Sequence, residues 1–167
     1  MPSISGLPRR LLGFLTTAFA ATVLATTLAA APAQAAWSSP YAVDLQLRSY
    51  TSTGAEFLVG RLVGTLQFDS GNSQYLLSLI MCRQSSYVNP NVRILINGVT
   101  HQWFSPSDNT RRPESCGGGH GLSGVISGAY AYGGVIPSIT VSFAGIHFDY
   151  STAKDITRSA FYDNPYN

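Results

Sequence analysis

Two short apolar segments separated by only two residues constrain the fold of this chain more than any other feature. Residues 92–96 (VRILI) and 99–104 (VTHQWF) flank the dipeptide Asn97-Gly98. A two-residue type I′ hairpin turn needs positive φ at both central positions, and Asn-Gly is the pair that it favours. The sequence therefore predicts a tight hairpin of two antiparallel strands.

Strand signals recur through most of the remaining chain. Residues 41–50 alternate apolar and polar side chains, the period of a half-buried strand, and residues 74–83 are apolar on both faces, which indicates a central strand. Turn residues separate further predicted strands at 56–68, 122–132, 139–143 with an extension to 150, and 156–162. About seven or eight short strands with little helix predict an all-β fold, an antiparallel β-sandwich or small barrel, with an immunoglobulin-like sandwich as the default.

Two glycines interrupt the predicted strand at 56–68. Gly60 and Gly64 share a face with apolar residues such as Leu62 and Leu66. Glycine inside a strand often marks a bulge or a close approach by another group. We expect these positions to leave room for a large ring or for the facing sheet, or to mark a bulge.

The amino-terminal segment, residues 1–35, has the pattern of a secretory signal peptide. Arg9 and Arg10 precede an uncharged run from 11 to 31, and Ala33-Gln34-Ala35 matches a small-x-small cleavage site. The run is long enough to span a bilayer, but no basic cluster follows it and a cleavage site does. We expect a secreted, extracellular mature chain, one domain over residues 36–167, with no membrane attachment after cleavage.

The charge of the expected mature chain argues against nucleic acid as a partner. Removing Arg9 and Arg10 from the ten Lys and Arg leaves eight, against eight Asp and Glu. Binding to nucleic acid relies on a surplus of positive charge that neutralises phosphates. The neutral mature chain lacks that surplus.

The two cysteines, Cys82 and Cys116, predict one disulfide. An even number of cysteines in an exported protein is most simply explained by pairing. A bridge closing a loop of this length contributes roughly 3 to 4 kcal/mol in the chain-entropy model. The alternative, a Cys116 thiolate with His120 as its base, needs a reduced thiol and leaves Cys82 unexplained.

The segment at 105–121 is predicted to be a long irregular loop tethered by Cys116. It carries Arg111 and Arg112, a pair that can clamp a carboxylate or a phosphate on a ligand. Exposed loops often carry such charges without any ligand. The loop is therefore a candidate binding segment, with solvation of the two arginines as the alternative.

The sequence contains no clear catalytic, metal or cofactor motif. Ser123 stands in GLSGV, which lacks the last glycine of a nucleophile elbow. His101, His120 and His147 are too widely spaced for a metal motif. His147 and Asp149 share a strand face, so this pair can hold a metal or act as an oriented base, with a solvent-facing polar stripe as the alternative. We predict no catalytic residue, no metal ligand and no cofactor.

Aromatic residues give the better indication of function. The chain has 9 Tyr, 8 Phe and 2 Trp, and Tyr130, Tyr132 and Tyr150 lie in its C-terminal third. Tyrosine provides a rigid contact surface with a polar hydroxyl, which suits sugar rings and protein partners. The alternative is that these rings form cross-strand pairs that stabilise the sheet.

Three functions remain open from the sequence. The first is a non-catalytic secreted module that binds an extracellular glycan or protein through its tyrosines and the long loop. The second is a protease inhibitor or toxin-like protein that presents the 105–121 loop. The third is a hydrolase, which would need His147, Asp149 and a serine to meet in a cleft. The first is our prediction.

Overall fold

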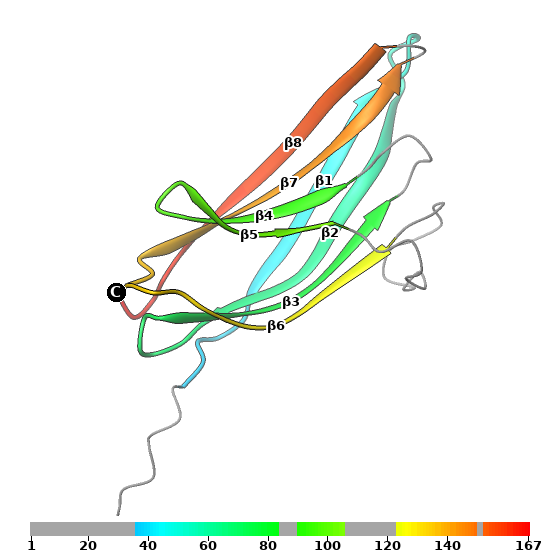
Figure 1. Cartoon of the computed structure of the whole chain (residues 1–167). Coiled ribbons are helices and arrows are strands. Elements are labelled where there is room, and N and C mark those ends of the chain that lie inside the picture. Colours follow the sequence, from blue (N-terminus) through cyan, green and yellow to red (C-terminus); the bar gives the residue numbers. More distant parts are fainter. Residues whose placement is uncertain (1–35, 84–89, 106–122, 150–151) are drawn as a thin grey trace, which may run out of the picture. The chain divides into compact units, whose positions relative to one another are not determined.

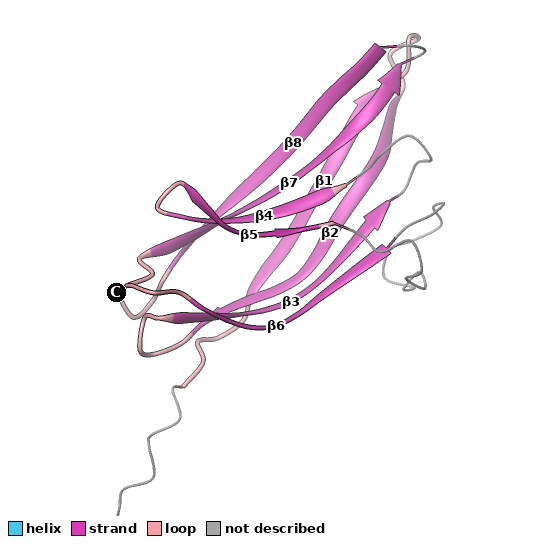
Figure 2. Ribbon diagram, viewed as in Figure 1, coloured by secondary structure: helices cyan, strands magenta, loops and turns pink. Residues whose placement is uncertain are grey.

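Eight antiparallel strands make up most of the part of the chain that the computed structural model describes, residues 36–83, 90–105, 123–149 and 152–167 (Figures 1 and 2). The all-β prediction is confirmed. Among these residues no helix is long and apolar enough to cross a membrane. The strands are β1 (Tyr41–Tyr50), β2 (Glu56–Phe68), β3 (Gln74–Arg83), β4 (Asn91–Ile96), β5 (Val99–Phe104), β6 (Ser123–Ala131), β7 (Ser138–Asp149) and β8 (Thr152–Asp163).

The strands form two four-stranded sheets. The first sheet has the order β1-β2-β3-β6 and the second has the order β5-β4-β7-β8 (Figure 1). The chain crosses between the sheets after β3, after β5 and after β6. This order differs from that of an immunoglobulin domain, in which the first, second, fifth and fourth strands share a sheet. The β-sandwich prediction agrees with the structure, but the immunoglobulin-like default does not match the order of the described strands.

The inward faces of both sheets share one hydrophobic core. On β1 the apolar positions Val43, Leu45 and Leu47 are buried, as the alternating pattern predicts. β3 lies between β2 and β6, and its inward side chains, from Tyr75 to Met81, are fully or almost fully buried. The expected central position of this strand is confirmed. The second sheet contributes inward residues of β4 and β7 to the same cluster, including Val92, Ile94, Val141 and Phe143.

The two glycines of β2 are sites of close approach. A Cβ at Gly60 would lie 3.2 Å from Cζ of Phe143, a ring contributed by the other sheet. Next to Gly60 the register of β1 and β2 shifts between Leu47 and Arg48. At Gly64, which has a φ of 148°, a Cβ would overlap the carbonyl oxygen of Ser78 on β3. The expectation of space for a ring and of a bulge in this strand is confirmed at Gly60.

The predicted hairpin is present, and it contains a bulge that the sequence pattern did not show. Asn97 and Gly98 have φ values of 52° and 77°, the positive values that a type I′ turn requires. Beyond the turn the register of β4 and β5 shifts between Ile94 and Leu95, so that His101 is the extra residue. A bulge changes which side chains of the following segment face inward.

Several expectations concern residues outside the described ranges. The signal segment 1–35, Arg111, Arg112, Cys116, His120 and Tyr150 all lie there, as does nearly all of the 105–121 loop. Cys82 is buried on β3. The structure does not show the predicted Cys82–Cys116 disulfide, because Cys116 is not among the described residues.

Candidate binding surface

The two described tyrosines of the predicted binding face belong to a ring cluster between β3, β5 and β6. Tyr130 stacks on the buried ring of Tyr75, with centroids 5.5 Å apart, and Phe104 meets its edge at 5.6 Å. Tyr132 makes an edge contact with His101 at 5.3 Å. Both tyrosines are half-buried. Their rings therefore have packing partners within the sandwich, as the cross-strand alternative expects.

His147 meets a serine, but in a buried setting. The Nδ1 atom of His147 on β7 lies 2.9 Å from Oγ of Ser49 on β1, and the ring of Phe57 packs edge-on against the imidazole at 5.1 Å. His147 is 5% exposed and Ser49 is 8% exposed. Neither residue lines either of the two hollows described below. A polar pair of this kind links the two sheets and gives a substrate little access.

The outer face of the second sheet carries exposed rings. Trp103 on β5 is 64% exposed and Phe161 on β8 is 66% exposed. The register places Trp103 beside Arg93, and Phe161 beside Thr140 of β7. Trp103 stands on one edge strand of this sheet and Phe161 on the other, so they are two separate exposed rings. Rigid exposed rings provide contact area for a ligand at low entropic cost. This face therefore has the aromatic surface that the sequence led us to seek elsewhere.

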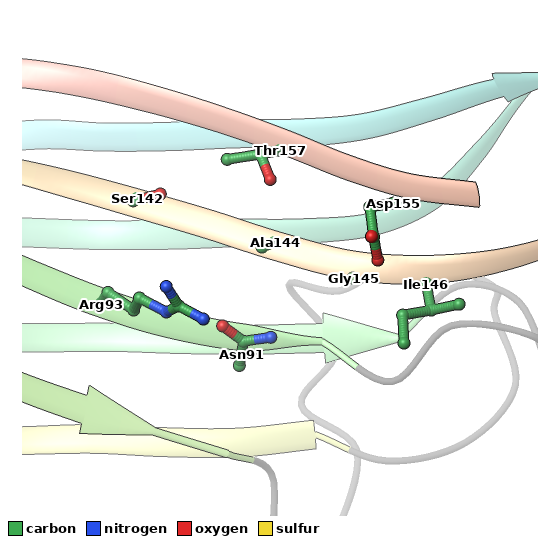
Figure 3. Close-up of a pocket in the computed structure, with 8 residues that line it drawn as sticks. All are labelled: Asn91, Arg93, Ser142, Ala144, Gly145, Ile146, Asp155 and Thr157. Carbon is green, nitrogen blue, oxygen red and sulfur yellow. The ribbon is translucent and has the colours of Figure 1, made fainter. Parts of the chain in front are cut away.

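A hollow of about 390 Å³ lies on the same face, and Arg93, the cross-strand partner of Trp103, borders it (Figure 3). Arg93 and Asn91 of β4 border it on one side, and Asp155 and Thr157 of β8 border it on the other. β7 supplies the floor between them through Ser142, Ala144, Gly145 and Ile146, of which the first three are small. The hollow exists because short side chains on β7 lie between longer ones on the flanking strands.

The charges of this hollow differ from those on the first sheet. There, Arg61 donates two hydrogen bonds to Asp44, and this contact lowers the pKa of the Asp44 carboxyl. Within the described part of the chain, neither Arg93 nor Asp155 forms an ion pair or a side-chain hydrogen bond. One cation and one anion therefore border the hollow with their hydrogen-bonding groups available.

Asn91 adds an unsatisfied polar atom. Its carboxamide oxygen Oδ1 is buried and has no hydrogen-bond partner. Leaving a buried acceptor unpaired costs about 1 to 3 kcal/mol, so native structures rarely keep one without a reason. The oxygen needs a donor, and the residue that carries it lines the hollow.

A second hollow, of about 370 Å³, has a different character. It lies where the segment before β1 meets the end of the chain, and no charged side chain lines it; its residues are Ser38, Ser39, Pro40, Tyr41, Pro165 and Tyr166. Its hydrogen-bonding groups are fewer and neutral. Within the described residues, no three His, Cys, Asp or Glu side chains gather closely enough to hold a metal ion. The hollow beside Arg93 is therefore the better candidate site.

Sequence reasoning missed Trp103, Arg93 and Asp155. In a hairpin of strict two-residue register, Trp103 would face Val92 and point into the core. The bulge at His101 moves Trp103 opposite Arg93, whose side chain points outward between two buried neighbours. One signal in the sequence could have found Arg93, because it stands between the apolar residues Val92 and Ile94 and this alternation indicates an exposed side chain. The residue of β5 that pairs with Arg93, however, depends on the bulge.

Comparison with known proteins adds no relative: no family model, no curated protein and no solved structure matches this chain.

Proposed function

We propose that this chain is a secreted, non-catalytic binding module that contacts an extracellular glycan or protein through the outer face of the β5-β4-β7-β8 sheet. The observation that carries the proposal is the combination on one face of two exposed rings, Trp103 and Phe161, with a hollow bordered by uncompensated charges. Rigid aromatic groups supply contact area at low entropic cost, and a few polar groups fix the orientation of a ligand.

Secretion and the disulfide belong to the same proposal. The signal-peptide pattern at 1–35 supports export, and export supports pairing of Cys82 with Cys116. The neutral charge of the mature chain supports a partner other than nucleic acid.

The proposed binding surface contains Trp103 and Phe161 instead of the tyrosines that the sequence suggested. Tyr130 and Tyr132 are engaged in the ring cluster, whereas Trp103 and Phe161 are about two-thirds exposed. A hydrolase centred on His147 has weaker support, because the imidazole and Ser49 are buried and border neither hollow. An inhibitor that presents the 105–121 loop would depend on residues outside the described ranges.

The test compares exposed rings on different surfaces. The protein purified from the culture medium of an expressing host is mixed with insoluble polysaccharides and, separately, with immobilised extracellular proteins of that host. We expect Trp103→Ala and Phe161→Ala each to weaken retention about fivefold or more, with little change in Tm.

Tyr50→Ala is the matched control, because Tyr50 is 60% exposed but lies on β1 of the first sheet. This variant should bind as the parent does. Equal losses for all three variants, or no loss for Trp103→Ala and Phe161→Ala, would show that the outer face of the second sheet is not the binding surface.

A further inference from the structure

The hollow bordered by Arg93 and Asp155 has the size of a small ligand subsite. Its volume of about 390 Å³ lies near the lower end of the range for small-molecule sites, about 300 to 1,000 Å³. At about 30 Å³ per water molecule the hollow has space for about a dozen waters, more than one hexose ring displaces. The hollow is thus large enough for one ring unit of a longer molecule.

Its charges favour a neutral ligand that both donates and accepts hydrogen bonds. Arg93 offers N–H donors and Asp155 offers carboxylate acceptors, and neither has a partner within the described part of the chain. A polyanion would gain from Arg93 but be repelled by Asp155, and the opposite holds for a polycation. Hydroxyl groups donate to carboxylates and accept from guanidinium groups, so they satisfy both sides at once.

The remaining polar groups of the hollow require the same chemistry. Asn91 Oδ1 lacks a donor, and a ligand hydroxyl can supply one when the carboxamide turns toward the hollow. Ser142 of β7 and Thr157 of β8 add two hydroxyl groups that donate or accept. A ligand rich in hydroxyl groups satisfies this set better than an apolar ligand or an extended peptide does.

Trp103 indicates where such a ligand continues. Arg93 is its cross-strand partner, so the exposed indole lies next to the border of the hollow, one strand further out. Aromatic rings pack well against the apolar faces of sugar rings and leave the hydroxyl groups in water. A second ring unit can therefore lie on Trp103 while the first occupies the hollow.

We infer that the hollow lined by Asn91, Arg93, Asp155 and Thr157 is the subsite for one ring unit of a neutral, hydroxyl-rich glycan that continues toward Trp103. This inference rests on the proposed function. The chemistry of the hollow selects neutral sugar over an acidic or amino sugar. The polymer itself spans the outer face of the second sheet.

The experiment fills the hollow and leaves the rings intact. Ala144 lies on its floor, and Ala144→Leu places a larger side chain there. Ala129→Leu is the matched control, because Ala129 is exposed on β6 of the first sheet. Retention is measured on insoluble cellulose and xylan as neutral probes, on cross-linked polygalacturonate as the acidic probe and on chitosan as the amino-sugar probe.

We expect retention on at least one neutral probe and a loss of about tenfold or more for Ala144→Leu, with no loss for Ala129→Leu. Asp155→Asn should weaken binding severalfold without removing volume, and this variant keeps the test valid if Ala144→Leu lowers Tm. Retention of the parent on the neutral probe should change less than about twofold between 0.05 and 0.5 M NaCl, because no net charge is neutralised on binding.

Three results would overturn the subsite. The first is retention on a neutral probe that depends on Trp103 but is unchanged in both Ala144→Leu and Asp155→Asn; the binding face would then stand without the subsite. The second is salt-sensitive retention on polygalacturonate or chitosan alone. The third is retention on no polysaccharide. The proposed function is then tested separately, by measuring whether Trp103→Ala and Phe161→Ala weaken retention on an immobilised extracellular protein.

Discussion

The hydroxyl group of Tyr75 and Nδ1 of His101 lie 2.8 Å apart, and this hydrogen bond joins β3 of the first sheet to β5 of the second. The ring of Tyr75 is fully buried, and His101 is the extra residue of the bulge in β5. The bond thus joins an internal strand of the first sheet to an edge strand of the second, beside the rings of Tyr130 and Tyr132. Two treatments test this hydrogen bond: mutation of Tyr75, and alkaline pH, which removes the proton of the tyrosine hydroxyl.

Tyr75→Phe should destabilise the domain by about 1 kcal/mol, because the ring remains in place while His101 loses its partner. Urea unfolding of the secreted protein measures the change. Tyr50→Phe is the control, since the hydroxyl of Tyr50 is exposed and makes only a 3.5 Å contact with Glu56. An unchanged free energy of unfolding in Tyr75→Phe would mean that the hydrogen bond contributes nothing net.

Stability should fall steeply above pH 10. Burial, with a smaller contribution from Tyr130, raises the pKa of Tyr75 above its ordinary value of 10.0. The unfolded chain then loses the Tyr75 proton at a lower pH than the folded protein does, so the contribution is complete below pH 10 and is lost as pH rises further. Burial also raises the pKa of Tyr130 and of Tyr162.

Unfolding free energies measured at about pH 8 and about pH 11 test this expectation. The decline between the two values should be smaller in Tyr75→Phe than in the parent, because one raised pKa has been removed. A parallel decline in both proteins would contradict the assignment of alkaline sensitivity to Tyr75.

Gly98→Val should destabilise the hairpin by about 1 kcal/mol or more, whereas Gly98→Asn should have a mild effect. A Cβ at Gly98 meets no atom within 4 Å, so the cost comes from the φ of 77° alone, which a β-branched side chain tolerates poorly. Thermal unfolding of the two variants gives the comparison. Equal shifts in Tm would argue that this turn contributes little to stability.

Gly64→Ala should be more damaging than Gly60→Ala. At Gly64 an added Cβ would overlap the backbone of Ser78, which cannot move without breaking the pairing of β2 with β3. At Gly60 the nearest atom is at 3.2 Å and belongs to the ring of Phe143, which can shift slightly. We expect about 3 kcal/mol or more at Gly64 and about 1 kcal/mol at Gly60 in urea unfolding. The reverse order would contradict the β2–β3 register.

The unreduced secreted protein should have a mass about two units below that of the dithiol, as a Cys82–Cys116 bridge requires. Reduction should lower Tm, corresponding to roughly 2 to 5 kcal/mol of lost stability. Two thiols that react freely with an alkylating agent before reduction would show that the bridge is absent.

Local patterns in the sequence predicted the strands well. Alternation located β1, and the Asn97-Gly98 pair located the β4–β5 turn, because side-chain period and turn chemistry are properties of adjacent residues. The same patterns did not predict which strands would be neighbours. The position of β6 beside β3, and of β7 beside β4, depends on contacts between residues far apart in the chain.

At the candidate site, local sequence and tertiary structure determined different features. The sequence by itself determined that residues 92–96 and 99–104 form a hairpin through the Asn97-Gly98 turn, and therefore that His101 and Trp103 lie on one strand. Only the tertiary structure decided that Trp103 faces solvent, because His101 pairs with Tyr75 across the sheets and Phe104 packs on Tyr130. Both inward contacts are possible in one short strand only if a bulge shifts the register between them, and that shift exposes the ring beside the hollow.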